Sequence, residues 1–127
     1  AYPHQLSGGM QSRAALARVI ACDPAVILMD EPFAALDNFN REAMQRELSR
    51  IEQTQHKSII FVTHNLDEAL VLGQRIVLMA DGVIERELDL SPWRYPRDLL
   101  QAELIAFKRE IVAFFNQEEQ NNKRRDG

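Results

Sequence analysis

The sequence predicts an α/β fold with a largely parallel sheet and flanking helices. Two short runs rich in apolar residues, Ala25–Met29 and Ser58–Thr63, have the length and composition of strands buried on both faces. Segments whose apolar residues recur at helical spacing precede and follow them. The resulting order of strand, helix, strand, helix, strand is typical of doubly wound α/β proteins.

The first predicted helix covers residues 8–21. Ser7 is a good N-cap residue, and Cys22-Asp23-Pro24 ends the helix because proline disfavours helical backbone at the residue before it. The apolar residues expected on its inner face are Met10, Ala14, Ala17 and Ala21. The first strand follows directly and stops before Pro32.

Two further helices are predicted on either side of the second strand. Asp37 is expected to cap a helix over residues 38–54, whose inward residues are Met44, Leu48 and Ile51. A shorter helix over residues 66–72 is expected to stop at Gly73.

The C-terminal third is predicted to contain a hairpin and one long helix. Asp81-Gly82 is a strong two-residue turn signal between strands at 75–80 and 83–87. Residues 88–97 form a connector, and Asp98 is expected to cap an amphipathic helix over 98–115. The predicted organisation is therefore a main part (1–97), this helix, and a polar tail at 116–127 that we expect to be disordered.

Composition excludes several classes of protein. The 127 residues amount to one domain or part of one, and 46% hydrophobic with 27% charged residues excludes a wholly disordered chain. A net charge of −4 offers no general attraction to nucleic acid, so no nucleic-acid partner is expected. A single cysteine, Cys22, rules out a disulfide scaffold.

Three features are predicted to meet where parallel strands end, which is where open α/β sheets bind ligands. Ser7-Gly8-Gly9 opens a helix and exposes backbone N–H groups that suit a phosphate, although such a tripeptide alone is more often a plain helix cap. Asp30-Glu31 suits a magnesium nucleotide, or is simply a solvated strand end. His64 follows the second strand and suits a phosphate or a water, whereas an isolated histidine is more often satisfied by backbone groups.

Taken together, these residues resemble the second half of an ABC-type ATPase, the ATP-binding subunit of ATP-binding cassette transporters, which has a P-loop NTPase fold. Leu6–Arg13 (LSGGMQSR) resembles the family signature, and Val26–Pro32 resembles the Walker B strand with its adjoining glutamate. Ala35-Leu36-Asp37 resembles the D-loop, and Thr63-His64 the switch histidine. Four motifs in family order at family spacing identify the chain as similar to this family over residues 2–87, and more weakly to 115.

The resemblance implies a role for each matching residue. Asp30 would hold Mg²⁺ through water, Glu31 would be the general base, and His64 would bridge the γ-phosphate of ATP. Asp37 would couple two sites across a dimer. The signature would contact the nucleotide of the opposite subunit through Leu6, Ser7, Gly8, Gly9, Met10 and Gln11. Met10 replaces a common glutamine and is interpreted as a subfamily mark.

One departure from the family pattern is large. The 127 residues contain no glycine-rich loop with Lys and Ser/Thr, so they lack the Walker A motif, its strand and the glutamine loop that follows it. Both motifs precede the signature in the family, so the chain resembles the C-terminal portion of a cassette. We expect this portion to hydrolyse no ATP by itself.

The amino-acid sequence around these motifs resembles that of importers. His64–Leu70 is similar to the corresponding segment of importers in general. The connector ending at Tyr95–Asp98, followed by a single amphipathic helix, resembles the nitrate, sulfonate and taurine importer group. The resemblance then implies a homodimer with a second ATP-binding subunit, docked on permease subunits and served indirectly by a solute-binding protein. The expected location is peripheral, on the cytoplasmic face of the inner membrane. A soluble ABC ATPase of DNA repair or translation, or a non-catalytic fragment, remains the alternative.

Overall fold

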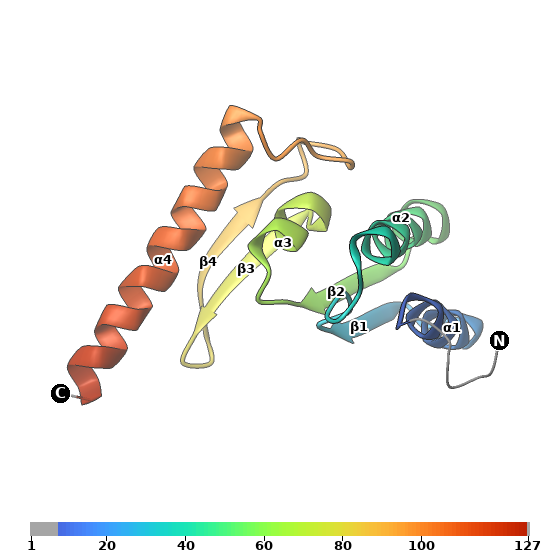
Figure 1. Cartoon of the computed structure of the whole chain (residues 1–127), viewed down its shortest axis with the longest axis horizontal. Helices are drawn as coiled ribbons and strands as arrows, with labels where there is room; N and C mark the ends of the chain where they lie inside the picture. Colours follow the sequence, from blue (N-terminus) through green and yellow to red (C-terminus); the bar gives the residue numbers. More distant parts are fainter. Residues whose placement is uncertain (1–7, 127) are drawn as a thin grey trace. The chain divides into compact units, whose positions relative to one another are not determined.

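The structure is a computed structural model that describes residues 8–126. These residues form two compact units, which divide between His64 and Asn65. The first unit contains α1 (Gly8–Ala21), β1 (Val26–Asp30), α2 (Asn38–Gln55) and β2 (Ser58–Val62). The second contains α3 (Leu66–Leu72), β3 (Arg75–Ala80), β4 (Val83–Asp89) and α4 (Ala102–Asp126) (Figure 1). The order of helices and strands agrees with the prediction.

β1 and β2 pair in parallel in the first unit, joined by α2 as the crossover helix. Val26 lies opposite Ser58 and Asp30 opposite Val62, so the two strands end level with each other. Asp37 caps α2, because its side-chain Oδ1 accepts a 2.8 Å hydrogen bond from the backbone N–H of Asn40. The inward residues predicted for α2 are confirmed: Met44, Leu48 and Ile51 are buried.

The inner face of α1 differs from the predicted one. Leu16 is buried with 4% of its surface exposed, whereas Ala14 and Ala17 are exposed. Leucine removes more apolar surface from water than alanine does, so burying Leu16 stabilises this orientation more than burying an alanine would. α1 and α2 pack against each other through this face.

Among residues 8–126, the β1–β2 pair is covered on one face, whereas both faces were expected to be buried. Side chains alternate between the two faces of a strand, and Ile27 on one face is buried at 2% exposure. On the other face Leu28 is 72% exposed and Ile60 is 54% exposed. A run of apolar residues predicts strand length, but it does not reveal how many layers cover the sheet.

The second unit is built around an antiparallel hairpin. Asp81 and Gly82 both have positive φ angles, 52° and 75°, which is the conformation of the predicted two-residue turn. Its core is one cluster drawn from every element of the unit: Leu70, Ile76, Leu78, Leu88, Leu90, Leu104, Ile111 and Phe114. β4 continues to Asp89, two residues beyond the predicted end at 87.

The connector before α4 is fastened by Arg97, which is 8% exposed. Its guanidinium donates hydrogen bonds of 2.7–3.2 Å to the backbone carbonyls of Trp93, Leu70, Val71 and Leu90. Burial lowers the pKa of Arg97 from its ordinary value. A charge placed among carbonyl oxygens in this way holds the connector against α3.

α4 differs from the helix predicted over 98–115. It begins at Ala102, because Asp98 instead accepts a 2.9 Å bond from the N–H of Leu100 in a turn. It continues to Asp126 through the segment expected to be disordered. Within that segment, Lys123 pairs with Glu119 at 3.1 Å, and Arg125 reaches Asp81 of the hairpin at 2.9 Å. Ion pairs of this kind support a polar helix that has little apolar surface to bury.

Candidate functional site

The first unit presents its chemically active residues where β1 and β2 end. The backbone N–H of Glu31 donates to the carbonyl of Val62 at 2.8 Å, which adds one further bond to the parallel ladder. Glu31 itself has a φ angle of 48°, in the left-handed region that non-glycine residues seldom adopt. The chain therefore turns sharply at Glu31, directly after the strand.

The Glu31 carboxylate lies against the segment that follows β2. Its Oε1 accepts a 2.9 Å hydrogen bond from the backbone N–H of His64. Its Oε2 accepts a 3.4 Å bond from the hydroxyl of Thr63. The glutamate side chain is 32% exposed, so the carboxylate remains accessible from one side.

His64 is brought to the same place but points outward. Its side chain is 97% exposed, and its Nε2 lies 3.8 Å from Oε1 of Glu31. Glu31 and His64 were both predicted as site residues from strand ends that are 33 positions apart. The structure brings them together, with an imidazole free to reach a ligand beside a fixed carboxylate.

Asp30 is the last residue of β1, and its side chain is exposed on the same face of the strand as Leu28. Among residues 8–126, no group of three His, Cys, Asp or Glu side chains converges as a metal cluster. Mg²⁺ does not require one, because it is commonly bound by one or two carboxylates together with water and substrate phosphates. An accessible carboxylate at the strand end fits that chemistry.

Asp37 lies six residues beyond Glu31, and both of its carboxylate oxygens accept hydrogen bonds. Its Oδ1 caps α2 through the N–H of Asn40, and its Oδ2 accepts a 3.2 Å bond from the Asn40 side-chain amide. Arg41 in the first turn of α2 donates from its Nη2 to the carbonyl of Leu36 at 3.1 Å. The turn that carries Asp37 is therefore held from both sides.

The signature residues lie partly outside the described part of the chain. Leu6 and Ser7 lie outside the described residues, whereas Gly8, Gly9 and Met10 form the first turn of α1, which begins at Gly8 as predicted. Gln11 follows them and is exposed.

Sequence reasoning gave no role to Thr63 or Arg41, although both order this site. Thr63 precedes the switch histidine in sequence, and its contact with Glu31 joins positions 32 residues apart. Two features of the sequence could have indicated these roles: a hydroxyl residue next to the switch histidine, and an arginine in the first turn of α2.

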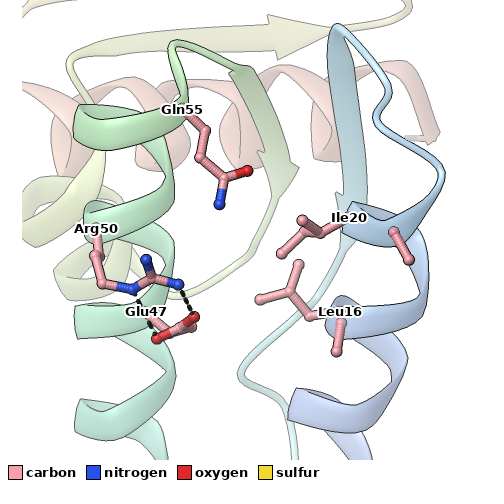
Figure 2. A pocket seen from close by; sticks show the side chains of 7 residues that line it. Leu16, Ile20, Glu47, Arg50 and Gln55 are labelled. Carbon is pink, nitrogen blue, oxygen red and sulfur yellow. Dashed lines mark hydrogen bonds and ion pairs between the residues drawn. The ribbon is translucent and has the colours of Figure 1, made fainter.

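A separate open pocket of about 480 Å³ lies between α1 and α2 (Figure 2). Leu16 and Ile20 of α1 form its apolar side, and Glu47, Arg50 and Gln55 of α2 form its polar side. Glu47 and Arg50 satisfy each other with an ion pair at 2.6 Å. None of the predicted site residues lines this pocket.

Comparison with known proteins shows which family the chain is similar to. A family model described as "ABC transporter" matches residues 1–34. An uncharacterised ABC transporter ATP-binding protein of Methanocaldococcus jannaschii is 44% identical over 93% of this chain and 45% of its own length. A dimeric ATP-binding cassette, solved in a post-hydrolysis state with ADP and Pi, is 41% identical with a TM-score of 0.60, over 69% of this chain and 38% of that one.

The similarity supports the predicted resemblance to the C-terminal part of an ABC transporter ATP-binding protein. The fold of the chain is that of an ABC ATPase fragment, which confirms the predicted fold class. The chain spans less than half the length of the curated ABC relatives that it matches. Within residues 8–126, no helix is both long and apolar enough to cross a membrane.

The ABC relatives do not single out the predicted nitrate, sulfonate and taurine group. The choline transport ATP-binding protein of Bacillus subtilis is 51% identical over 87% of this chain and 29% of its own length. The aliphatic sulfonates import ATP-binding protein of Rhodococcus jostii is 44% identical over 87% of this chain and 45% of its own length. The similarity therefore supports an importer-type ATP-binding subunit more broadly than the sequence motifs implied.

Proposed function

We propose that the complete protein hydrolyses Mg-ATP as the ATP-binding subunit of an ABC importer that takes up a small solute. The observation that carries this proposal is the pairing of the Glu31 carboxylate with His64 at the ends of two neighbouring parallel strands. Ligands of open α/β sheets bind at this edge. The similarity to transport and import ATP-binding proteins supports the same function.

Glu31 polarises the attacking water in this proposal. Each carboxylate oxygen carries two lone pairs. One lone pair of Oε1 accepts the hydrogen bond from the His64 backbone, and one of Oε2 accepts the bond from Thr63. One lone pair on each oxygen remains to accept a proton from water. The two bonds also restrict rotation of the carboxylate, so the base is oriented before the nucleotide arrives.

His64 and Asp30 supply the remaining polar groups on this edge. The exposed His64 ring donates to the γ-phosphate, where negative charge must be stabilised during phosphoryl transfer. Asp30 holds Mg²⁺ through water. When bound, the ion would supply the positive charge that this acidic strand end lacks, next to the phosphate oxygens.

The site is completed by a second ATP-binding subunit, since a dimeric cassette is among the similar structures. Ser7, Gly8 and Gly9 contact the γ-phosphate of the nucleotide held by the opposite subunit, together with the rest of the signature. Asp37 couples the two sites across this homodimer. The dimer docks on permease subunits at the cytoplasmic face of the inner membrane, and a solute-binding protein acts indirectly through the permease.

The proposed solute is a small, charged organic compound. The two relatives named above are a choline transport protein and an aliphatic sulfonates import protein. The candidate solutes are therefore a quaternary ammonium compound and a sulfonate such as taurine. Uptake of radiolabelled choline, taurine and nitrate by cells that express the complete transporter separates these solutes. Uptake of nitrate alone would contradict the organic class.

Glu31→Gln in the complete protein tests the catalytic assignment. Loss of a positioned base slows hydrolysis roughly 10²–10⁴-fold, while nucleotide binding is retained. Single-turnover ATP hydrolysis measures the rate, and Glu42→Gln on the exposed side of α2 is the matched control. A Glu31→Gln rate within a few-fold of the wild type would show that Glu31 is not the base.

Residues 1–127 alone are proposed to be inactive, because no Walker A motif lies among them. Calorimetric titration of this segment with Mg-ATP is expected to give no binding at micromolar concentrations. Stoichiometric binding by a cooperatively folded segment would reveal a phosphate site other than those described.

A further inference from the structure

The last residue of β2 and the two residues after it hold Glu31 through three hydrogen bonds. Val62 accepts the Glu31 backbone N–H at 2.8 Å, and the His64 backbone N–H donates to Oε1 at 2.9 Å. The third bond comes from the Thr63 hydroxyl, which is 3.4 Å from Oε2. Two of these contacts use backbone groups, so a substitution cannot remove them without moving the strand. The Thr63 hydroxyl is the one contact of the three that a side chain makes.

We propose that Thr63 is a positioning residue for the Glu31 carboxylate. This inference rests on the proposed function, in which Glu31 polarises the attacking water. A carboxylate held at Oε1 alone can still rotate about its last side-chain torsion, which is broad for glutamate. A second bond at Oε2 fixes the plane of the carboxylate and therefore the direction of its free lone pairs.

Threonine is suited to this task by its branched side chain. Two heavy atoms on Cβ restrict χ1, so the hydroxyl samples fewer directions than a serine hydroxyl does. Thr63 is partly buried, and the position where it leaves β2 is set by the pairing of Asp30 with Val62. Valine keeps this shape and lacks the hydroxyl, whereas serine keeps the hydroxyl on a freer side chain.

The test uses the complete ATP-binding protein with four variants: Thr63→Val, Thr63→Ser, Glu31→Gln and the Thr63→Val/Glu31→Gln double variant. Losing a hydrogen bond to a charged group of this kind lowers kcat roughly tenfold in Thr63→Val. The KM for Mg-ATP stays within about twofold, because the contact orients the base and does not bind nucleotide. Thr63→Ser is expected to restore kcat to within about threefold of the wild type, because it keeps the donor.

The double variant distinguishes positioning from a general structural role. If Thr63 acts through Glu31, Thr63→Val slows the Glu31→Gln protein by less than about twofold, because the base it orients is already gone. Further slowing of about tenfold would overturn the proposal, as would a Thr63→Val protein that binds nucleotide poorly and is not rescued by serine.

The outcomes also separate this inference from the proposed function. A slow Glu31→Gln protein together with an unaffected Thr63→Val protein overturns the role of Thr63 and leaves Glu31 as the base. A Glu31→Gln protein of nearly wild-type rate removes the proposed base itself, whatever the Thr63 variants show.

Discussion

The Oε1 atom of Glu31 lies 2.9 Å from the backbone nitrogen of His64, a residue 33 positions further along the chain. The bond links the residue after β1 with the residues after β2 and brings the predicted base and the predicted switch histidine to one edge of the sheet. Because the donor is a backbone group, the orientation of Glu31 depends on the path of the chain more than on the identity of residue 64. Variants of His64 are therefore expected to leave the carboxylate in place.

Asp37 has a capping role that the structure shows and a dimer role that remains a proposal, and two variants separate them. Asp37→Ala removes the cap of α2 and is expected to cost about 1 kcal/mol of unfolding free energy. Asp37→Asn keeps a capping oxygen but loses the charge. It should keep near-normal stability in chemical denaturation. If the carboxylate couples two sites, ATPase activity of the dimer falls in both variants. Normal activity in a stable Asp37→Asn protein would contradict that role.

Ser7→Arg tests the composite site in the complete protein. A bulky cation at the start of α1 blocks the close approach of a partner's phosphate that Gly8 and Gly9 permit. ATP-driven dimerisation should be lost while nucleotide binding by each monomer stays nearly intact. Gel filtration with ATP in the Glu31→Gln background checks the dimer. A persistent dimer would show that the signature does not contact nucleotide across the interface.

Adjacent residues of α4 test how firmly that helix belongs to the second unit. Ile111 is fully buried at 0% exposure, whereas Val112 is 40% exposed. Ile111→Ala is expected to lower the unfolding free energy by about 2–5 kcal/mol, because it leaves a cavity in the core. Val112→Ala should change the unfolding free energy by less than about 0.5 kcal/mol, as is usual for surface sites. Urea denaturation of both variants measures the difference. Equal, small effects would mean that α4 does not pack on this core.

The pairing of Asp23 with Lys57 predicts a pH dependence of stability. The Lys57 ammonium lies 2.6 Å from Oδ1 of Asp23, and its hydrogen bond and charge lower the pKa of that carboxyl. A carboxyl whose folded pKa is lowered stabilises the fold above its unfolded pKa of roughly 3.9. That contribution disappears as the pH falls through the lowered folded value.

Lys57→Met should return the pKa of Asp23 toward its ordinary value, which a carboxyl NMR titration measures directly. Asp89 is the internal control, because the pKa of its carboxyl is lowered chiefly by hydrogen bonds from Ser91, independently of Lys57. An unchanged Asp23 titration in Lys57→Met would contradict the assignment.

The sequence by itself determined the order of the elements and the features that depend on neighbours within one turn. Asp37 as the cap of α2, Gly73 as the end of α3 and Asp81-Gly82 as the hairpin turn were all predicted and confirmed. The bonds involved join groups only a few residues apart, so the local pattern contains the information. The motif residues Asp30, Glu31 and His64 were predicted as site residues from their places at strand ends.

Only the tertiary structure decided what these residues contact. The Thr63–Glu31 hydrogen bond and the Arg125–Asp81 ion pair of α4 join residues 32 and 44 positions apart. The exposure of Leu28 and Ile60 depends on how many layers cover the sheet. Hydrophobic periodicity shows that a strand or helix has an apolar face, but the partner that covers it comes from a distant part of the chain. Side-chain direction at the site likewise follows from strand register and backbone path, which form only when β1 and β2 pair.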